Sequence, residues 1–155
     1  MRNLLLLFVF LTFTYCDSYV PGQQDKNREK TKIFNTSVAV KFMDDYAKFC
    51  NRQGDRNEWI KNNSLLTDKF KSEFKKFIDS SPQLDFDPIF DAQDYPDKGF
   101  EVLKSDSVSG FVTLNGKDWQ QFTVIVKIAN KGDTWLVDGA GIINMPKDMQ
   151  RKERQ

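Results

Sequence analysis

The sequence contains no histidine and only two cysteines, Cys16 and Cys50. The absence of histidine excludes a Cys-His dyad and a Ser-His-Asp triad, because both use an imidazole as the general base. It also excludes the usual zinc and copper ligand sets. If Cys16 is removed or acylated, Cys50 has no intramolecular disulfide partner, and we expect it to be a buried structural thiol. We therefore expect no disulfide framework and no bound cofactor.

Without histidine, only carboxylates remain as ligands for hard cations such as calcium. The acidic residues that come closest together in the sequence surround Pro88 and Phe90. Their spacing lacks the glycine and the terminal glutamate of an EF-hand loop. We therefore expect no metal site in this acidic segment, whose members are Asp85, Asp87, Asp91 and Asp94.

The chain also lacks a strong net charge, since 23 Lys and Arg residues oppose 22 Asp and Glu residues. Without an overall positive field, a nucleic-acid partner is disfavoured. The lysine-rich segment after Thr67 is interrupted by Asp68, Glu73 and Asp79. This pattern favours a solvated helix face over a docking patch for anionic headgroups.

The apolar run Leu4–Leu11 is too short to cross a bilayer, which takes about 20 residues. Because it follows Arg2, it is typical of a secretory signal peptide, which we place at residues 1–16. Cys16 stands where a lipoprotein carries its acylated cysteine, but Phe13–Tyr15 lacks the small residue that usually precedes it. Acylation at Cys16 and ordinary cleavage nearby stay as alternatives. We expect an exported protein, either periplasmic or a membrane-anchored lipoprotein that faces the periplasm.

Residues 17–34 are polar and charged, which predicts a flexible linker. Helical spacing begins after Asn35–Ser37 and ends near Gly54. A short helix carrying Trp59 is predicted next, and then a third helix that opens at Leu65 and stops before Pro82. The apolar stripe of the first helix is expected to contain Val38, Phe42, Tyr46 and Phe49.

The stretch Phe100–Gly139 alternates between apolar and polar residues and predicts an antiparallel meander. Asn115–Gly116 predicts a type I′ hairpin turn, because both central residues of that turn need a positive φ. A second turn is predicted at Asn130–Asp133, before a strand that contains Trp135–Val137. One face of the intervening strand is expected to carry Phe122, Val124, Val126 and Ile128.

Residues 84–96 connect the predicted helices to the predicted strands. The segment is too rich in proline and aspartate for a regular element and too rich in large apolar residues for a flexible loop. We expect an ordered connection at the rim of a pocket or interface. Its polar members and one tyrosine of the first helix are the candidate binding residues: Asp87, Gln93, Asp94, Tyr95 and Tyr46.

The order of these features over residues 36–145 resembles a bacterial envelope family described as a domain of unknown function, within the nuclear-transport-factor-two-like superfamily. The most specific pieces are Asp87–Pro88, Ala92–Pro96 and Trp135–Asp138. The resemblance implies a cone-like, cystatin-like α+β fold, in which helices cover a curved antiparallel sheet and often leave a pocket. Helices followed by strands agree with this class. We expect a single α+β domain at residues 35–146 and a charged tail at residues 147–155.

Three functions follow from these observations. The first is a non-catalytic envelope protein that binds another envelope protein, or that neutralises a toxin as an immunity factor. The second is a binder of a small apolar ligand, with Phe42, Tyr46 or Phe74 lining a cavity in the cone. The third is implied by the resemblance alone: an isomerase-like or dehydratase-like enzyme that uses Tyr46 with Asp44 or Asp45.

Overall fold

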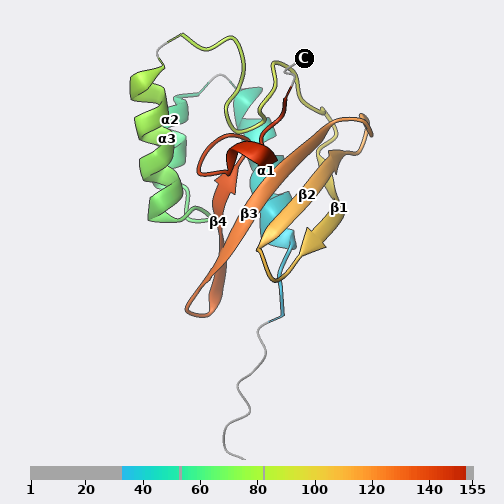
Figure 1. The fold of residues 1–155 in the computed structure, drawn as a ribbon. Helices are drawn as coiled ribbons and strands as arrows, with labels where there is room; N and C mark the ends of the chain where they lie inside the picture. The colour runs from blue at the N-terminus through green and yellow to red at the C-terminus, as the bar shows by residue number, and fades with distance from the viewer. Residues whose placement is uncertain (1–32, 53, 82, 153–155) are drawn as a thin grey trace, which may run out of the picture. The chain divides into compact units, whose positions relative to one another are not determined.

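The computed structural model describes residues 33–52, 54–81 and 83–152. Within these residues, helices precede an antiparallel sheet, so the predicted α+β class is confirmed (Figure 1). The helices are α1 (Ser37–Cys50), α2 (Arg56–Asn62) and α3 (Asp68–Ser80). The strands are β1 (Phe100–Asp106), β2 (Phe111–Gly116), β3 (Thr123–Lys131) and β4 (Thr134–Ala140), and a 3-10 helix, η1 (Lys147–Met149), follows them.

The predicted signal peptide, Cys16 and the linker up to Lys32 lie outside the described residues. None of the described helices is both long and apolar enough to cross a membrane.

Side-chain caps explain where two of the helices begin. The Asp55 carboxylate accepts a hydrogen bond from the Glu58 backbone N–H at 3.1 Å at the start of α2. The Thr67 hydroxyl does the same for the Phe70 N–H at 3.1 Å at the start of α3. Such caps satisfy backbone donors that have no partner inside the helix. α3 therefore begins after Thr67, not at Leu65 as predicted.

The residues before α3 belong to the edge of the sheet. Leu66 forms a parallel bridge with Val137, and the Val137 N–H donates to the Leu65 carbonyl at 2.8 Å. The buried Thr67 hydroxyl also donates to the Asp138 carboxylate at 2.8 Å. These bonds fix the start of α3 against β4.

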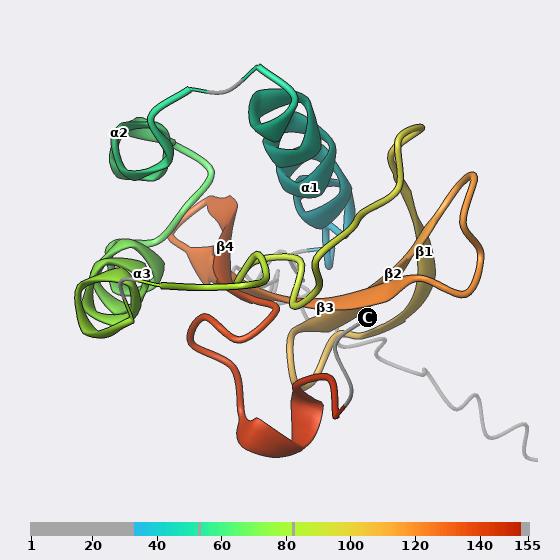
Figure 2. The ribbon, with the colours of Figure 1, turned by 90° about the horizontal axis from the view of Figure 1, so that it is seen from above.

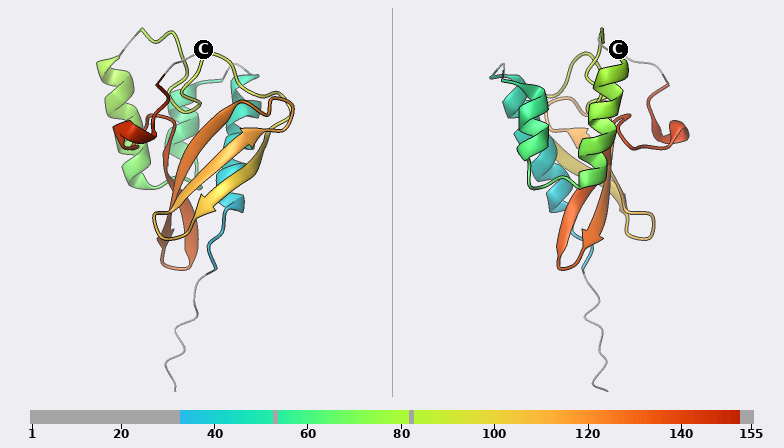
Figure 3. Two further views of the ribbon diagram at one scale, coloured as in Figure 1. Left: turned by 45° about the vertical axis from the view of Figure 1, so that its right-hand side comes forward. Right: turned by 90° about the vertical axis from the view of Figure 1, so that its left-hand side faces the viewer.

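α1 lies across one face of the sheet, with α2 and α3 beside it (Figures 2 and 3). Phe42 and Tyr46 are fully buried, and Phe49 is half-buried near the end of the same stripe. The predicted apolar stripe of α1 is therefore confirmed. The helices, the connection at residues 84–96 and the sheet all contribute side chains to the core. Its largest buried side chains include Tyr46, Phe42, Phe70, Phe74, Phe90 and Phe100.

The sheet is an antiparallel meander in the order β1-β2-β3-β4. The predicted type I′ turn at Asn115–Gly116 is wrong. Asn115 pairs with Thr123 inside the sheet, and neither turn residue has the positive φ that the turn requires. The reason is that the Asn115 side chain is buried, where its amide donates to Glu101 and Gln120 at 3.2 and 3.1 Å.

The second predicted turn is confirmed. Gly132 and Asp133 connect β3 to β4, with Lys131 paired to Thr134, and Gly132 has a φ of +64°. The predicted alternation along β3 is also confirmed, because its buried residues include Val124, Val126 and Ile128.

β1 forms an exposed edge of the sheet. Phe100 is its only buried residue, and a register shift between Val102 and Lys104 leaves Leu103 out of the pairing. A bulge and a charged residue on an edge strand discourage pairing with a further strand. The apolar side chains of Val102 and Leu103 on β1, and of Val108 in the turn after it, are exposed.

Both ends of the described chain contact the rest of the domain. The Trp135 indole N–H donates to the Ile33 carbonyl at 3.0 Å, and the Phe34 ring meets the Trp135 ring edge-on at 5.2 Å. The Arg151 backbone N–H donates to the Asp91 carboxylate at 2.6 Å. Contacts of the domain therefore extend beyond residues 35–146 in both directions.

Candidate functional site

The predicted loop at residues 84–96 is fastened to the helices through the Asp87 carboxylate. Its Oδ1 accepts from the backbone N–H groups of Ile89 and Phe90 at 2.8 and 3.1 Å. Its Oδ2 accepts from the Tyr46 hydroxyl at 2.7 Å and lies 3.4 Å from the Arg56 guanidinium. Because both oxygens are engaged and the side chain is only 11% exposed, Asp87 acts as a brace for the loop.

Two neighbouring acids titrate unusually beside this carboxylate. Burial first, and then the Asp87 charge, raise the pKa of Tyr46 well above 10.0. The same two causes, in the same order, raise the pKa of the half-buried Cys50 thiol from 9.0 to about 11. Both groups therefore stay protonated at neutral pH, and neither is activated as a nucleophile or as a base.

The acidic residues that an enzyme would pair with Tyr46 are engaged elsewhere. The Asp44 carboxylate accepts from the Phe100 backbone N–H at 2.8 Å, and Asp45 pairs with Lys41 at 2.6 Å. Tyr46 is fully buried and has no solvent-exposed surface. A substrate needs a cavity that reaches the reacting group. The geometry therefore gives no support to isomerase-like chemistry at this tyrosine.

Three of the predicted binding residues lie on the outer side of the loop. The Tyr95 ring stacks on Phe90, with centroids 4.3 Å apart, and its hydroxyl donates to the Asn51 side chain at 2.9 Å. Gln93 and Asp94 are exposed. The structure thus joins Tyr46 and Asp87, two of the five predicted residues, through a hydrogen bond and leaves these three outside that pair.

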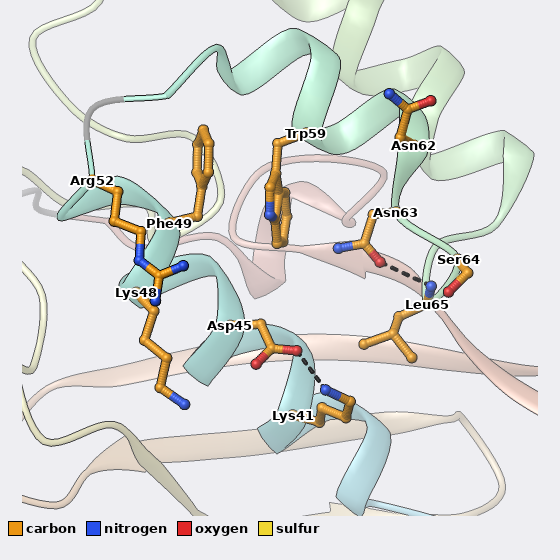
Figure 4. Close-up of a pocket in the computed structure, with 10 residues that line it drawn as sticks. All are labelled: Lys41, Asp45, Lys48, Phe49, Arg52, Trp59, Asn62, Asn63, Ser64 and Leu65. Carbon is orange, nitrogen blue, oxygen red and sulfur yellow. Dashed lines mark hydrogen bonds and ion pairs between the residues drawn. The ribbon is translucent and has the colours of Figure 1, made fainter.

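A groove between α1 and α2 was not predicted (Figure 4). It consists of two hollows of about 530 and 450 Å³, which share four of their lining residues. We call it the α1–α2 groove. One wall comes from α1 and the residues after it: Lys41, Asp45, Lys48, Phe49 and Arg52. The other wall comes from α2 and the residues on either side of it: Asp55, Glu58, Trp59, Asn62, Asn63, Ser64 and Leu65.

Two aromatic rings form the apolar part of the groove. Phe49 and Trp59 stack with centroids 5.2 Å apart and planes at 25°. The Trp59 ring also packs against Tyr46 and Phe42, at 5.5 and 6.0 Å. Figure 4 shows the Trp59 ring reaching from α2 toward α1. These contacts fix the ring although it is only partly buried, so a bound partner would not need to order it.

The α1 wall carries an excess of positive charge. Lys41, Asp45 and Lys48 are spaced as i, i+4 and i+7, which places them on one side of the helix. The Asp45 carboxylate pairs with Lys41 at 2.6 Å. Neither Lys48 nor Arg52 forms an ion pair with any described residue. Two uncompensated cations therefore stand beside the aromatic pair.

The sequence contains one indication of the α1 wall of the groove, which is the spacing of its polar residues. Lys41, Asp45, Lys48 and Arg52 follow one another at intervals of three or four, next to the apolar stripe that we interpreted as core. The short helix that carries Trp59 was predicted, and its tryptophan ring packs against the buried core. The spacing of residues in the sequence could not show that α2 packs beside α1 in a way that leaves a groove between them.

The groove has the chemistry of a binding surface. It combines cations, carboxylates, amides and aromatic rings. Within the described residues, no three cysteine, aspartate or glutamate side chains gather as a group that could hold a metal ion. The arrangement can supply hydrogen bonds, charge and apolar contact to a partner.

Comparison of the chain with protein-family models, with curated proteins and with solved structures finds no match. The resemblance to the envelope family therefore stays a prediction.

Proposed function

We propose that this chain is an exported, non-catalytic protein-binding module, and that its α1–α2 groove holds an extended segment of a partner protein. The observation that carries the proposal is the half-exposed Trp59–Phe49 pair, flanked by Lys48, Arg52 and Asn63 in a solvent-open groove. Tryptophan and arginine are enriched among residues that dominate the energy of protein interfaces. An open groove favours a chain segment over a ligand that must be enclosed.

The alternative of a small apolar ligand inside the cone has less support. Phe42 and Tyr46, which were expected to line such a cavity if it existed, are fully buried and pack against other aromatic rings. We include in this proposal the cone-like, cystatin-like curvature of the sheet that the resemblance implies. In that arrangement the helices would fill the concave side of the sheet and present the groove outward.

The proposed partner is another envelope protein, or a toxin that the chain neutralises. The proposed location is the periplasm, with Cys16 as a lipid anchor if it is acylated.

If Cys16 is acylated, replacing it by alanine moves the protein from the membrane fraction to the soluble fraction. Unchanged fractionation rules out the anchor and leaves the groove proposal intact.

A steric block of the groove tests the proposed function. Ser64 lines the groove and is exposed, so Ser64→Trp fills the groove without a change in charge. Ser72→Trp is the matched control, because Ser72 is also exposed but lies on α3, where it lines a separate hollow between α2 and α3 and not the groove. Each C-terminally tagged variant is crosslinked in its native envelope, purified and analysed by mass spectrometry.

We expect one stoichiometric partner with the unaltered chain and with Ser72→Trp, and loss of that partner with Ser64→Trp. Thermal unfolding of both variants checks that the fold survives. If Ser64→Trp captures the partner as well as the control does, the groove is not the binding surface.

A further inference from the structure

We infer that the segment held in the α1–α2 groove is acidic: its carboxylates lie against Lys48 and Arg52, and one of its apolar side chains rests on the Trp59–Phe49 pair. This inference rests on the proposed function, because it names the chemistry of the partner that the groove would hold.

Charge complementarity supports an acidic occupant. Lys48 and Arg52 have no ion-pair partner among the described residues. The two carboxylates of the opposite wall accept hydrogen bonds from neutral donors. Asp55 accepts from the Glu58 backbone N–H at 3.1 Å, and Glu58 accepts from the Asn62 amide at 2.7 Å. Glu58 also lies 3.6 Å from the Lys61 ammonium, which compensates its charge. The α1 wall, with Lys48 and Arg52, is therefore the positive side of the groove, and an acidic segment along it is its complement.

Unused hydrogen-bond donors point the same way. The Asn63 side-chain oxygen is occupied by the Leu65 backbone N–H at 2.8 Å, which leaves the amide nitrogen free to donate into the groove (Figure 4). The Trp59 indole N–H and the Ser64 hydroxyl also donate to no described residue. Carboxylates offer only acceptors and form their strongest hydrogen bonds with cationic donors. A donor-rich groove therefore fits an acceptor-rich segment.

The helix dipole explains only part of this arrangement. Lys48 lies in the last turn of α1, where a cation is favoured by the negative end of the helix. Arg52 follows the C-cap residue Asn51, so the dipole acts on it more weakly. Helix stability therefore does not account for Arg52, or for Trp59 on the opposite wall of the groove.

An acidic protein segment is favoured over a nucleic acid, which also combines negative charge with stacking surfaces. Single-stranded nucleic acids bind in grooves where many cations follow the backbone. This groove offers two uncompensated cations, in a chain whose formal net charge is only +1. The match is closer to a short run of carboxylates around one apolar side chain.

The test uses a short synthetic peptide of aspartate and glutamate with a central phenylalanine, titrated into the full-length chain. The chain has three tryptophans, so NMR can follow three indole N–H signals, with that of Trp59 assigned from Trp59→Phe. We expect the Trp59 signal to shift while the signals of Trp119 and Trp135 stay in place. Lys48→Ala and Arg52→Ala should each weaken binding about 2- to 5-fold, and the effect should shrink with added salt.

Two control titrations decide the chemistry. A peptide in which lysine replaces every acidic residue should leave the Trp59 signal in place, and so should a single-stranded oligonucleotide. Lys117→Glu is the matched charge control for Lys48→Glu, because Lys117 is exposed and lies outside the groove. Lys117→Glu should retain binding of the acidic peptide, whereas Lys48→Glu should lose it. A Trp59 shift with the basic peptide or the oligonucleotide, or an unchanged signal with the acidic peptide, overturns the inference.

The native partner distinguishes this inference from the proposed function. If Ser64→Trp abolishes capture but Lys48→Glu captures the partner as well as Lys117→Glu does, the groove binds protein and the acidic chemistry is wrong. If Ser64→Trp has no effect, the proposed function itself fails.

Discussion

The Tyr46 hydroxyl donates a 2.7 Å hydrogen bond to the carboxylate of Asp87, which lies 41 residues further along the chain. The bond joins the core face of α1 to the loop that leads into the sheet. Arg56 at the start of α2 approaches the same carboxylate at 3.4 Å. One acidic side chain thus holds together α1, α2 and the loop, and it does so beside the aromatic core that supports the groove.

We predict that Tyr46→Phe and Asp87→Ala destabilise the fold unequally. Tyr46→Phe removes one hydrogen bond and leaves Asp87 with its other donors, which should lower the free energy of unfolding by about 1–2 kcal/mol. Asp87→Ala strands the Tyr46 hydroxyl and the N–H groups of Ile89 and Phe90, so the loss should be about 3 kcal/mol or more. Urea unfolding measures both, and equal losses would contradict the brace.

We predict that stability falls in alkaline solution through the buried phenol of Tyr46 and the half-buried thiol of Cys50. The native pKa of Tyr46 is raised well above 10.0, so the unfolded chain loses this proton first as the pH rises. The contribution of Tyr46 is complete below pH 10.0 and is lost as the pH rises toward the native pKa. Cys50 adds a similar loss between pH 9.0 and about 11.

Tyr46→Phe should therefore flatten the dependence of the unfolding free energy on pH above 10.0, and Cys50→Ser should flatten it from 9.0 upward. Denaturant titrations at a series of pH values measure both effects. Tyr95→Phe is a useful comparison, because the pKa of Tyr95 is also raised but its side chain is only half-buried. A curve for Tyr46→Phe that parallels the unaltered chain would show that this phenol does not control alkaline stability.

The outer residues of the loop should separate stability from binding. Asp94 is exposed, so Asp94→Ala should change the melting temperature very little. Tyr95→Ala removes the stack on Phe90 and the bond to Asn51, and should lower stability by about 1–2 kcal/mol. Thermal unfolding checks both values. If Asp94→Ala instead weakens capture of the native partner, the interface extends from the groove to this loop.

Periodicity was sufficient to predict the helices and the alternation of β3, because burial of one face imposes a regular spacing. It was insufficient where a residue type fits two roles. Asn115–Gly116 has the composition of a turn. In the structure, however, glycine is needed at position 116 for close packing, because a Cβ there would meet Pro96 Cβ at 2.8 Å. The brace at Asp87 depends on Arg56, 31 positions away, and no local pattern joins such residues. The groove likewise depends on how α1 and α2 pack.

The failed turn prediction leads to a direct test. At a turn position with a positive φ, Asn115→Gly would be neutral or stabilising. In the structure Asn115 is buried within β2 and bonded to Glu101 and Gln120, so the same change should cost about 1–3 kcal/mol. Chemical unfolding distinguishes the two outcomes. A stabilised Asn115→Gly variant would mean that the chain reverses at the predicted turn.

Two glycines with a positive φ provide a matched comparison. Gly132 has a φ of +64°, and no atom lies within 4 Å of the position that a Cβ would take, so Gly132→Ala should cost only the backbone strain of about 1–2 kcal/mol. Gly141 has a φ of +57°, and its added Cβ would collide with the carbonyl oxygens of Pro88 and Ile89. Gly141→Ala should therefore cost about 3 kcal/mol or more, through both strain and overpacking. Because the collision is with the backbone of the loop that follows Asp87, it would also loosen the brace. Equal unfolding free energies for the two variants would show that the loop does not pack against this turn.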